Sequence, residues 1–207
     1  EELRREVGRL ELAQKEKEQR AKLLRDLEQN LEGYAYSVKT VLKQAKAGVL
    51  RGVFGTVSQL IQVEEAYSVA IETALGGAAQ NLVCDNEGTA KAAIRMLKEQ
   101  NGGRATFLPL TSVKGSLLEE AGLRNCAGFV ALGAELVKAD RQYDGIVKSL
   151  LGRIAVAEDL DAAVEIAKRY RYRFRIVTLD GQVVNAGGSL TGGSQNKSSG
   201  LLSRKND

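Results

Sequence analysis

Two glycine pairs near the end of the chain come closest to the spacing of a ligand-binding motif. The segment 181–194 reads GQVVNAGGSLTGGS and sets Gly187-Gly188 and Gly192-Gly193 five positions apart. Glycine has no Cβ, so it adopts positive φ and lets another backbone or a ligand approach closely. Four glycines within seven residues therefore predict the close approach of some other group.

One candidate for that group is a nucleotide phosphate. Gly187, Gly192 and Ser194 nearly match G-x-x-x-x-G-K-[ST], but Gly193 stands where the phosphate-binding lysine belongs. The residues after Ser194 also lack the apolar period of a helix whose N-terminus would face the anion. Three interpretations stay open: a nucleotide-binding enzyme that uses the Gly187–Ser194 loop, a glycine-rich turn leaving a hairpin, and a glycine-lined contact with another protein. We favour the protein contact.

The remaining composition offers little for catalysis. The 207 residues include no His and no Trp, and only 5% are aromatic, so the commonest general base is missing. The acidic residues that stand out are at expected helix starts, where they favour the helix dipole and cap rather than pair for acid–base chemistry. These residues are Glu64, Glu65, Asp85, Glu87, Asp159 and Asp161. We therefore expect no enzyme activity and no cofactor.

The cysteines and the hydropathy bear on metal sites and on location. Cys84 and Cys126 lie 42 positions apart without a CxxC or Cys/His spacing, which predicts no metal site and two buried or half-buried thiols in a reducing cytosol. No stretch approaches the roughly 20 apolar residues of a membrane span. The sequence starts at Glu1 rather than Met and shows no signal peptide. We expect a cytoplasmic fragment of a longer protein.

The first 33 residues predict a helical arm. They contain no proline and are rich in the strong helix formers Glu, Lys, Arg, Leu and Gln. A weak heptad seam runs along them, formed by Leu3, Val7, Leu10, Ala21, Leu24 and Leu31. A helix this polar gains little unless its leucines meet a partner. We expect a partner helix to lie outside this sequence, and residues 195–207 to begin a returning helix.

Residues 34–194 predict an α/β body of mixed sheets, because short apolar strands alternate with helices of about ten residues. Its stretch 111–140 reads as irregular and is expected to separate two subdomains. Helices are predicted at 37–46, 64–75, 87–100, 143–151 and 160–170; strands are predicted within 53–63 and at 81–84, 106–110, 154–157, 174–179 and 182–185.

Basic residues are concentrated in this body. After residue 32 the chain carries 22 Lys and Arg against 17 Asp and Glu. Lys39, Lys43, Lys46 and Arg51 form a run without an acidic residue, which indicates either a polyanion-binding face or the solvated side of an amphipathic helix. A second run, 168–175, alternates basic and aromatic residues; on a strand, its arginines would share one face.

Four segments resemble the hinge domain of bacterial structural-maintenance-of-chromosomes (SMC) proteins. They are AIETALGGAAQNLV (70–83), GRATFLPL (103–110), YDGIVKSLLGRIAVAEDLDAA (143–163) and RFRIVTLDGQVVNAGGSLTGGS (173–194), of which the last is the most specific. The resemblance implies a two-subdomain hinge joining two coiled-coil arms, with ATPase heads, and hence ATP binding, outside this sequence. It further implies a role in chromosome condensation and segregation at the nucleoid.

The resemblance also implies the site residues. Two hinges would join as a homodimer through strand edges and glycines, with Gly187, Gly188, Gly192 and Gly193 at the joint and Gly76 and Gly77 as a lesser set. Such hinges contact DNA without sequence specificity near the junction with the arm, where lysines follow the glycine motif. Only Lys197 stands directly there, so the expected DNA site shifts to Lys39, Lys43, Lys46 and Arg51, with Lys197, Arg204 and Lys205 assisting.

Overall fold

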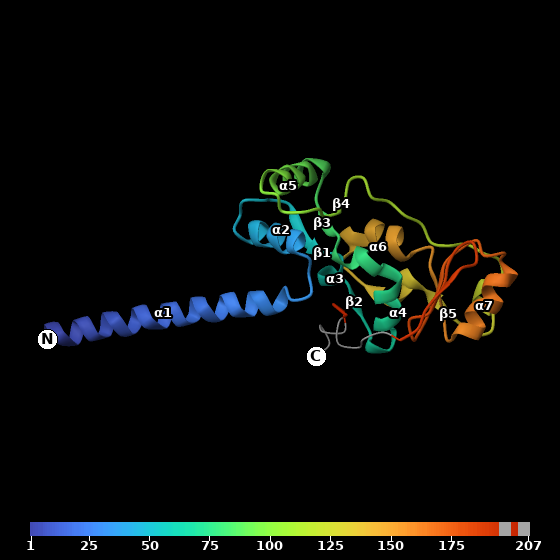
Figure 1. Cartoon of the computed structure of the whole chain (residues 1–207), viewed down its shortest axis with the longest axis horizontal. Coiled ribbons are helices and arrows are strands. Elements are labelled where there is room, and N and C mark those ends of the chain that lie inside the picture. The colour runs from blue at the N-terminus through green and yellow to red at the C-terminus, as the bar shows by residue number, and fades with distance from the viewer. Residues whose placement is uncertain (195–199, 203–207) are drawn as a thin grey trace. The chain divides into compact units, whose positions relative to one another are not determined.

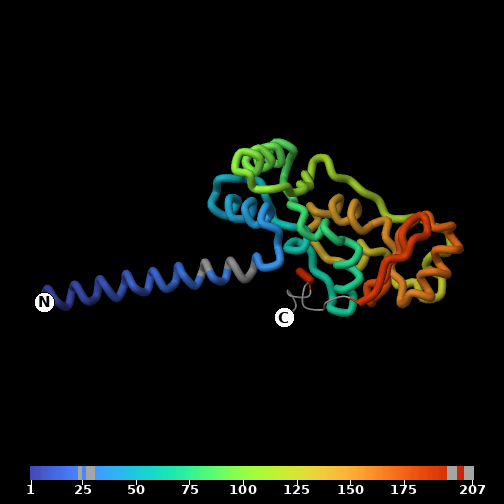
Figure 2. The backbone as a smooth tube through the Cα atoms, viewed as in Figure 1, coloured from blue at the N-terminus to red at the C-terminus, as the bar shows by residue number. Residues whose placement is uncertain are grey.

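The computed structural model describes residues 1–194 and 200–202, apart from the side chains of 23, 24 and 27–30 (Figure 1). The chain forms two compact units, Glu1–Tyr34 and Ala35–Asp207. In the first unit, the predicted helix is confirmed as α1 (Glu2–Asn30), a single continuous helix in Figure 2. On its apolar seam, Leu3 and Leu10 are 82% and 59% exposed. The seam therefore presents exposed leucines over its first turns.

The second unit is a mixed α/β body, which confirms the predicted fold class. Its helices are α2 (Tyr36–Lys46), α3 (Val57–Leu60), α4 (Glu65–Leu75), α5 (Glu87–Glu99), α6 (Asp144–Leu151) and α7 (Leu160–Arg169), with 3-10 turns η1 (Gly76–Gln80), η2 (Leu123–Asn125), η3 (Gly133–Leu136) and η4 (Arg141–Tyr143). Its strands are β1 (Val53–Thr56), β2 (Gln62–Val63), β3 (Leu82–Cys84), β4 (Phe107–Pro109), β5 (Phe129–Leu132), β6 (Val137–Lys138), β7 (Ala155–Ala157), β8 (Ile176–Thr178), β9 (Val183–Val184) and β10 (Leu190–Thr191).

The strands form three sheets. One has the order β1-β3-β4, the second β10-β9-β8-β7-β5, and the third pairs β2 with β6. Each larger sheet is built on a parallel pair joined by a crossover helix, β3-α5-β4 in one and β7-α7-β8 in the other. In each sheet an antiparallel strand with a register shift, β1 or β5, flanks this pair. The body therefore repeats one βαβ-based motif twice.

Local details repeat with the motif. Asn86 caps α5 by accepting from the Thr89 N–H at 3.1 Å, and Asp159 caps α7 by accepting from the Ala162 N–H at 2.8 Å. Both caps follow their strand after one residue, and side-chain acceptors of this kind satisfy the free amides of a helix start. Because each helix start carries such a cap residue, both crossover helices begin where the sequence predicts.

The two-stranded sheet joins the repeats. Gln62 of β2 pairs with Lys138 of β6, and each lies six residues after the last residue of its flanking strand, Thr56 in β1 or Leu132 in β5. The pairing therefore brings equivalent positions of the two halves together around a local pseudo-twofold axis. One apolar core contains residues of both halves, including Ile71 and Leu75 as well as Val156 and Val177. A second core lies within the later half, around Ile166 and Ile176.

Three sequence predictions need correction. The segment 53–63, predicted as a strand and its approach, contains two strands, because α3 separates β1 from β2. The stretch 111–140 is not irregular throughout, because it contains β5, which belongs to the second sheet, and β6, which belongs to the two-stranded sheet. Residues 168–175 do not lie on a strand: they end α7 and turn through positive φ at Arg171 and Tyr172 before β8 begins. Tertiary pairing defines the short strands, and local sequence does not show it.

Candidate interaction surfaces

The glycine motif forms a hairpin that adds one more strand to the larger sheet. After β9 the chain turns through Gly187 and Gly188, and β10 returns antiparallel, with Leu190 opposite Val184 and Thr191 opposite Val183. The turn is closed by the Gly188 N–H donating to the Asn185 carbonyl at 3.0 Å. Leu190 is 56% exposed, and β10 is an edge strand. The sequence did not predict β10, because the three residues between the glycine pairs are too few to carry a strand pattern.

Backbone conformation explains three of the four glycines. Gly187, Gly188 and Gly193 have φ of 90°, 103° and 133°, values that side chains rarely adopt. A Cβ on Gly187 or Gly193 would meet nothing within 4 Å in the described chain, so both positions face open space. Within one chain, the hairpin turn alone therefore accounts for these positive φ values. Any group that approaches Gly187 or Gly193 more closely has to come from outside the described chain.

Gln182 holds the second glycine pair. Its carboxamide accepts from the Gly193 N–H at 2.8 Å and donates to the Gly193 carbonyl at 3.0 Å, as a neighbouring strand would. A Cβ on Gly192 would collide with the same carboxamide. A side chain at position 192 would therefore displace the Gln182 carboxamide, whose two hydrogen bonds fix the segment after β10 to the β8–β9 turn.

This arrangement differs from a phosphate-binding loop. Leu190 and Thr191 lie between the glycine pairs and are extended and paired with β9, whereas a phosphate loop wraps its backbone amides around an anion. Through Ser194, the described residues start no helix that would face a phosphate.

Gly76 and Gly77 directly follow α4, near the loop that precedes β8. Gly76 has φ of 53°, whereas Gly77 has an ordinary φ, and a Cβ on Gly77 would meet no atom within 4 Å. Arg175, just before β8, donates to the Ala74 carbonyl at 2.9 Å, while the Tyr172 carbonyl in the same loop accepts from the Gly187 N–H at 2.9 Å. The loop 170–175 therefore contacts both the end of α4 and the glycine hairpin.

The free sheet edges differ between the halves. On the side away from β7, β8 pairs with β9, whereas the equivalent strand β4 ends its sheet without a neighbour among the described residues. At this end of its sheet, each half thus carries an edge strand, β4 in one and β10 in the other, while β1 and β5 are the edge strands at the opposite ends. Unpaired edges are templates for pairing with another chain.

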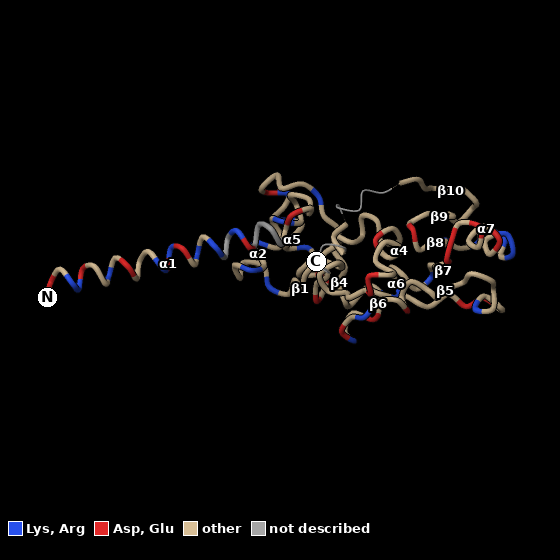
Figure 3. Tube along the Cα trace, turned by 90° about the horizontal axis from the view of Figure 1, so that it is seen from below, with Lys and Arg blue, Asp and Glu red and all other residues tan. Residues whose placement is uncertain are grey.

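Two helices next to the β1-β3-β4 sheet, α2 and α5, carry basic residues. Lys39, Lys43 and Lys46 lie on the side of α2 opposite its buried residues Ser37, Val38 and Val41. Arg51 is exposed in the following loop, and its carbonyl accepts from Thr89 at the start of α5 at 3.4 Å. Lys91, Arg95 and Lys98 of α5, which the sequence did not single out, are also exposed. Their i, i+4, i+7 spacing in the sequence could have indicated that they share one face of a helix. Figure 3 colours the Lys and Arg positions along the backbone blue.

The other predicted basic residues behave differently. Arg173 pairs with Glu120 at 2.8 Å and Lys168 with Glu165 at 3.6 Å, so this run serves contacts within the chain. Lys197, Arg204 and Lys205 lie outside the described residues. Between them in sequence, Leu202 is 3% exposed and belongs to the shared core, which places 200–202 against the body.

The thiols and carboxylates form no evident reactive centre. Cys84 and Cys126 are both free, the first buried and the second half-buried. Burial, reinforced by the negative charge of Asp85, raises the pKa of the Cys84 thiol to about 11. In the described part of the chain, no three His, Cys, Asp or Glu residues gather as metal ligands, and no helix is long and apolar enough to cross a membrane.

Comparison with known proteins decides the family. Residues 50–167 match the SMC proteins Flexible Hinge Domain. The chain belongs to the SMC hinge family. It is 41% identical over 189 residues to the Chromosome partition protein Smc of Bacillus subtilis (strain 168), and 38% identical over 189 residues to that of Halothermothrix orenii. These alignments cover 89% and 90% of the chain but 16% of each relative, so the chain spans about a sixth of their length.

Solved SMC hinges share this fold. The crystal structure of an asymmetric dimer of the Geobacillus stearothermophilus SMC hinge domain superposes with a TM-score of 0.81 at 41% identity, over 94% of this chain and 79% of that one. The Pyrococcus furiosus SMC Protein Hinge Domain superposes with a TM-score of 0.63 at 32% identity, over 73% of this chain and 78% of that one. The resemblance predicted from the glycine motif is confirmed at the level of the family.

Proposed function

We propose that this SMC hinge chain is a homodimerisation module of a chromosome partition protein, with no catalytic chemistry of its own. The observation that carries the proposal is the difference between the two repeats: β8 has an outer neighbour, and β4 has none among the described residues. A second copy could supply that neighbour from its exposed β10 edge, and the reverse contact would follow from twofold symmetry. The glycines flanking β10 favour this, because side-chain-free positions let two backbones approach.

The relatives support the same assignment. A related hinge at 41% identity has been crystallised as a dimer, and the matched full-length relatives are named for chromosome partition. We infer that coiled-coil arms extend from the hinge, with α1 as part of one arm and residues 195–207 as the start of the other. The exposed leucine seam of α1 supports a helical partner, since an apolar stripe gains stability only when it is covered. ATP-binding heads would belong to the rest of the protein.

Analytical ultracentrifugation of the 207-residue chain tests dimerisation. We expect a dimer at micromolar concentration, and a folded monomer when Gly187, Gly188, Gly192 and Gly193 are all replaced by Asp, because bulk and charge would enter a tight contact. Those substitutions also strain the turn, so Leu190→Asp is the cleaner variant: its exposed side chain can change without altering φ.

A matched control separates position from strain. Gly48 has φ of 80° and open space around its Cβ direction, like Gly187 with φ of 90°. Gly48→Asp therefore adds the same charge and a similar strain away from β10, and should leave the dimer intact while Gly187→Asp weakens it. A wild-type chain that sediments as a monomer at all accessible concentrations would refute the proposed function.

We further propose that the basic face of α2, with Arg51, binds the phosphates of DNA without sequence specificity. Three lysines on the outer side of a helix that carries no acidic residue support this, and α5 adds three exposed cations. Each phosphate contact contributes about −0.9 to the slope of log K against log salt. Lys39→Glu, Lys43→Glu and Lys46→Glu combined should flatten that slope by up to about 3. The equal charge change at exposed Lys114, Lys138 and Arg153 should leave it unaltered; equal effects of both triples would reject the site.

A further inference from the structure

The loop between α7 and β8 contains two consecutive residues in the left-handed region. Arg171 and Tyr172 have φ of 55° and 56°, and of the described non-glycine residues only Asn101 shares this property. A left-handed conformation costs a residue with a Cβ roughly 1–2 kcal/mol. Glycine would take the same conformation without that cost. A non-glycine residue at such a position points to a task that glycine cannot perform.

Tyr172 makes two contacts with the glycine hairpin. Its carbonyl accepts from the Gly187 N–H at 2.9 Å, and its ring lies 3.6 Å from the position that a Cβ on Gly188 would occupy. Its own N–H donates to the Ala167 carbonyl of α7 at 2.8 Å. The backbone of Tyr172 therefore links the last turn of α7 to the hairpin turn, and its ring supports that turn from one side.

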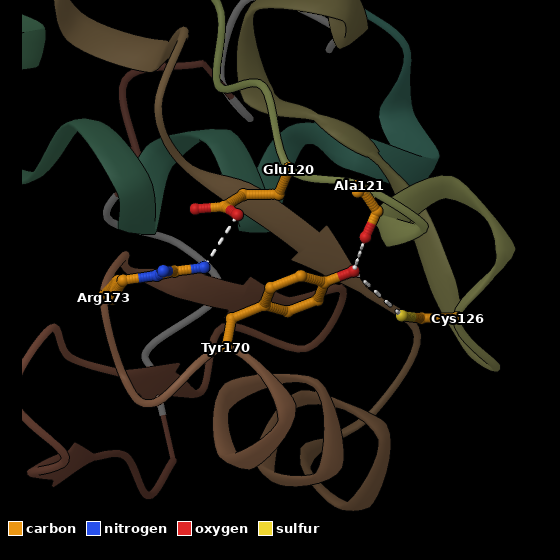
Figure 4. Close-up of polar contacts among 5 residues, drawn as sticks. All are labelled: Glu120, Ala121, Cys126, Tyr170 and Arg173. Carbon is orange, nitrogen blue, oxygen red and sulfur yellow. Dashed lines mark hydrogen bonds and ion pairs between the residues drawn. The ribbon is translucent and has the colours of Figure 1, made fainter.

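The flanks of this loop are fixed to the segment before β5 (Figure 4). The Tyr170 hydroxyl donates to the Ala121 carbonyl at 2.6 Å, and Arg173 pairs with Glu120 at 2.8 Å. Tyr170 is 6% exposed and packs against Phe174, with ring centroids 5.5 Å apart. Because both neighbours of the 171–172 turn are held in this way, the turn cannot relax freely into a less strained conformation.

We propose that Tyr172 is a positioning residue for dimerisation, which orients the Gly187–Gly188 turn and so presents the β10 edge to a second copy of this chain. The inference rests on the proposed homodimerisation. Tyr172 itself need not touch the partner. It acts through the hairpin, because β10 is only two residues long and pairs with β9 alone among the described strands. Such a short edge strand depends on the support of its turn for a defined direction.

Three variants of the 207-residue chain test this role. Tyr172→Gly keeps the left-handed backbone and removes the ring, so we expect the dimer dissociation constant to rise about tenfold or more, which corresponds to at least about 1.4 kcal/mol. Tyr172→Phe keeps the ring and should stay within about twofold of wild type. Arg171→Gly relieves the same strain one residue earlier with the ring intact, and should also leave dimerisation unchanged.

A readout at the hairpin distinguishes positioning from a general loss of stability. Amide hydrogen exchange at Gly187 and Gly188 should quicken in Tyr172→Gly, while exchange in the core strands β7 and β8 stays at the wild-type rate. The inference is overturned if Tyr172→Gly dimerises like wild type, if Arg171→Gly weakens the dimer equally, or if core exchange accelerates as much as hairpin exchange. A monomeric wild type would instead overturn the proposed function, and this inference with it.

Discussion

Gly152 offers a sharp test of how the segment after β4 is held against the body. It follows α6 with an ordinary helical φ of −67°, so alanine can adopt its backbone without strain. A Cβ there would nevertheless overlap the Ser116 and Lys148 carbonyl oxygens, and both belong to backbone that cannot rotate away. The Gly152 carbonyl also accepts from the Leu118 N–H at 2.8 Å, which ties the crossing segment to α6.

The expected cost of Gly152→Ala follows from that geometry. Overpacking a well-packed site costs about 1–3 kcal/mol, and backbone neighbours place this site near the middle or upper part of that range. With a urea dependence of about 2 kcal/mol per molar, a loss of about 2 kcal/mol lowers the unfolding midpoint by about 1 M. Gly8→Ala in α1 is the control, because nothing lies within 4 Å of its Cβ direction and its φ is not positive, so its midpoint should not fall. A midpoint for Gly152→Ala within about 0.2 M of wild type would refute the close contact.

Further predictions concern thiols, pH and caps. Iodoacetamide should modify Cys126 well before Cys84 in the folded chain, because Cys84 is buried and its pKa of about 11 keeps it protonated; mass spectrometry of time points measures the order. Because the pKa of Cys84 is raised in the folded chain, its contribution to the free energy of unfolding is complete below the ordinary pKa of 9.0 and is lost as the pH rises toward 11. The total loss is at most about 3 kcal/mol. Urea midpoints should therefore fall over that pH window, and should fall less in Cys84→Ala. Asp159→Ala should cost about 1 kcal/mol by urea unfolding, and the equivalent cap variant Asn86→Ala a similar amount; no change in either would contradict the capping geometry.

The helices were largely predictable because their signals are local. Asn86 and Asp159 are cap residues directly before amphipathic periods, and Gly76 ends α4 with positive φ, as its sequence indicates. The short strands were predictable only where apolar runs were long enough. β6 and β10 are two residues each, and their pairing with β2 and β9 depends on contacts that the local pattern does not encode.

The glycine motif shows the same limit. Its sequence predicts freedom of φ and close approach, and the structure assigns positive φ to Gly187, Gly188 and Gly193. The closest backbone contacts of glycines in the described body lie elsewhere, where Gly115 and Gly152 meet the segment and helix opposite them. Those isolated glycines carry no motif, so a search for glycine pairs passes over them. The dimer and DNA residues remain predictions.

The apolar core that spans both repeats has a consequence for dissecting the protein. Ile71 and Leu75 of α4 are buried in the same cluster as Leu151 and Val177 from the later repeat. A gene fragment ending within 111–140 would leave the apolar face of α4 exposed to solvent, and its product should misfold or precipitate. Despite the internal duplication, the shared core predicts that the whole body folds as one unit, so engineered hinges should tolerate the exchange of entire bodies but not of single repeats.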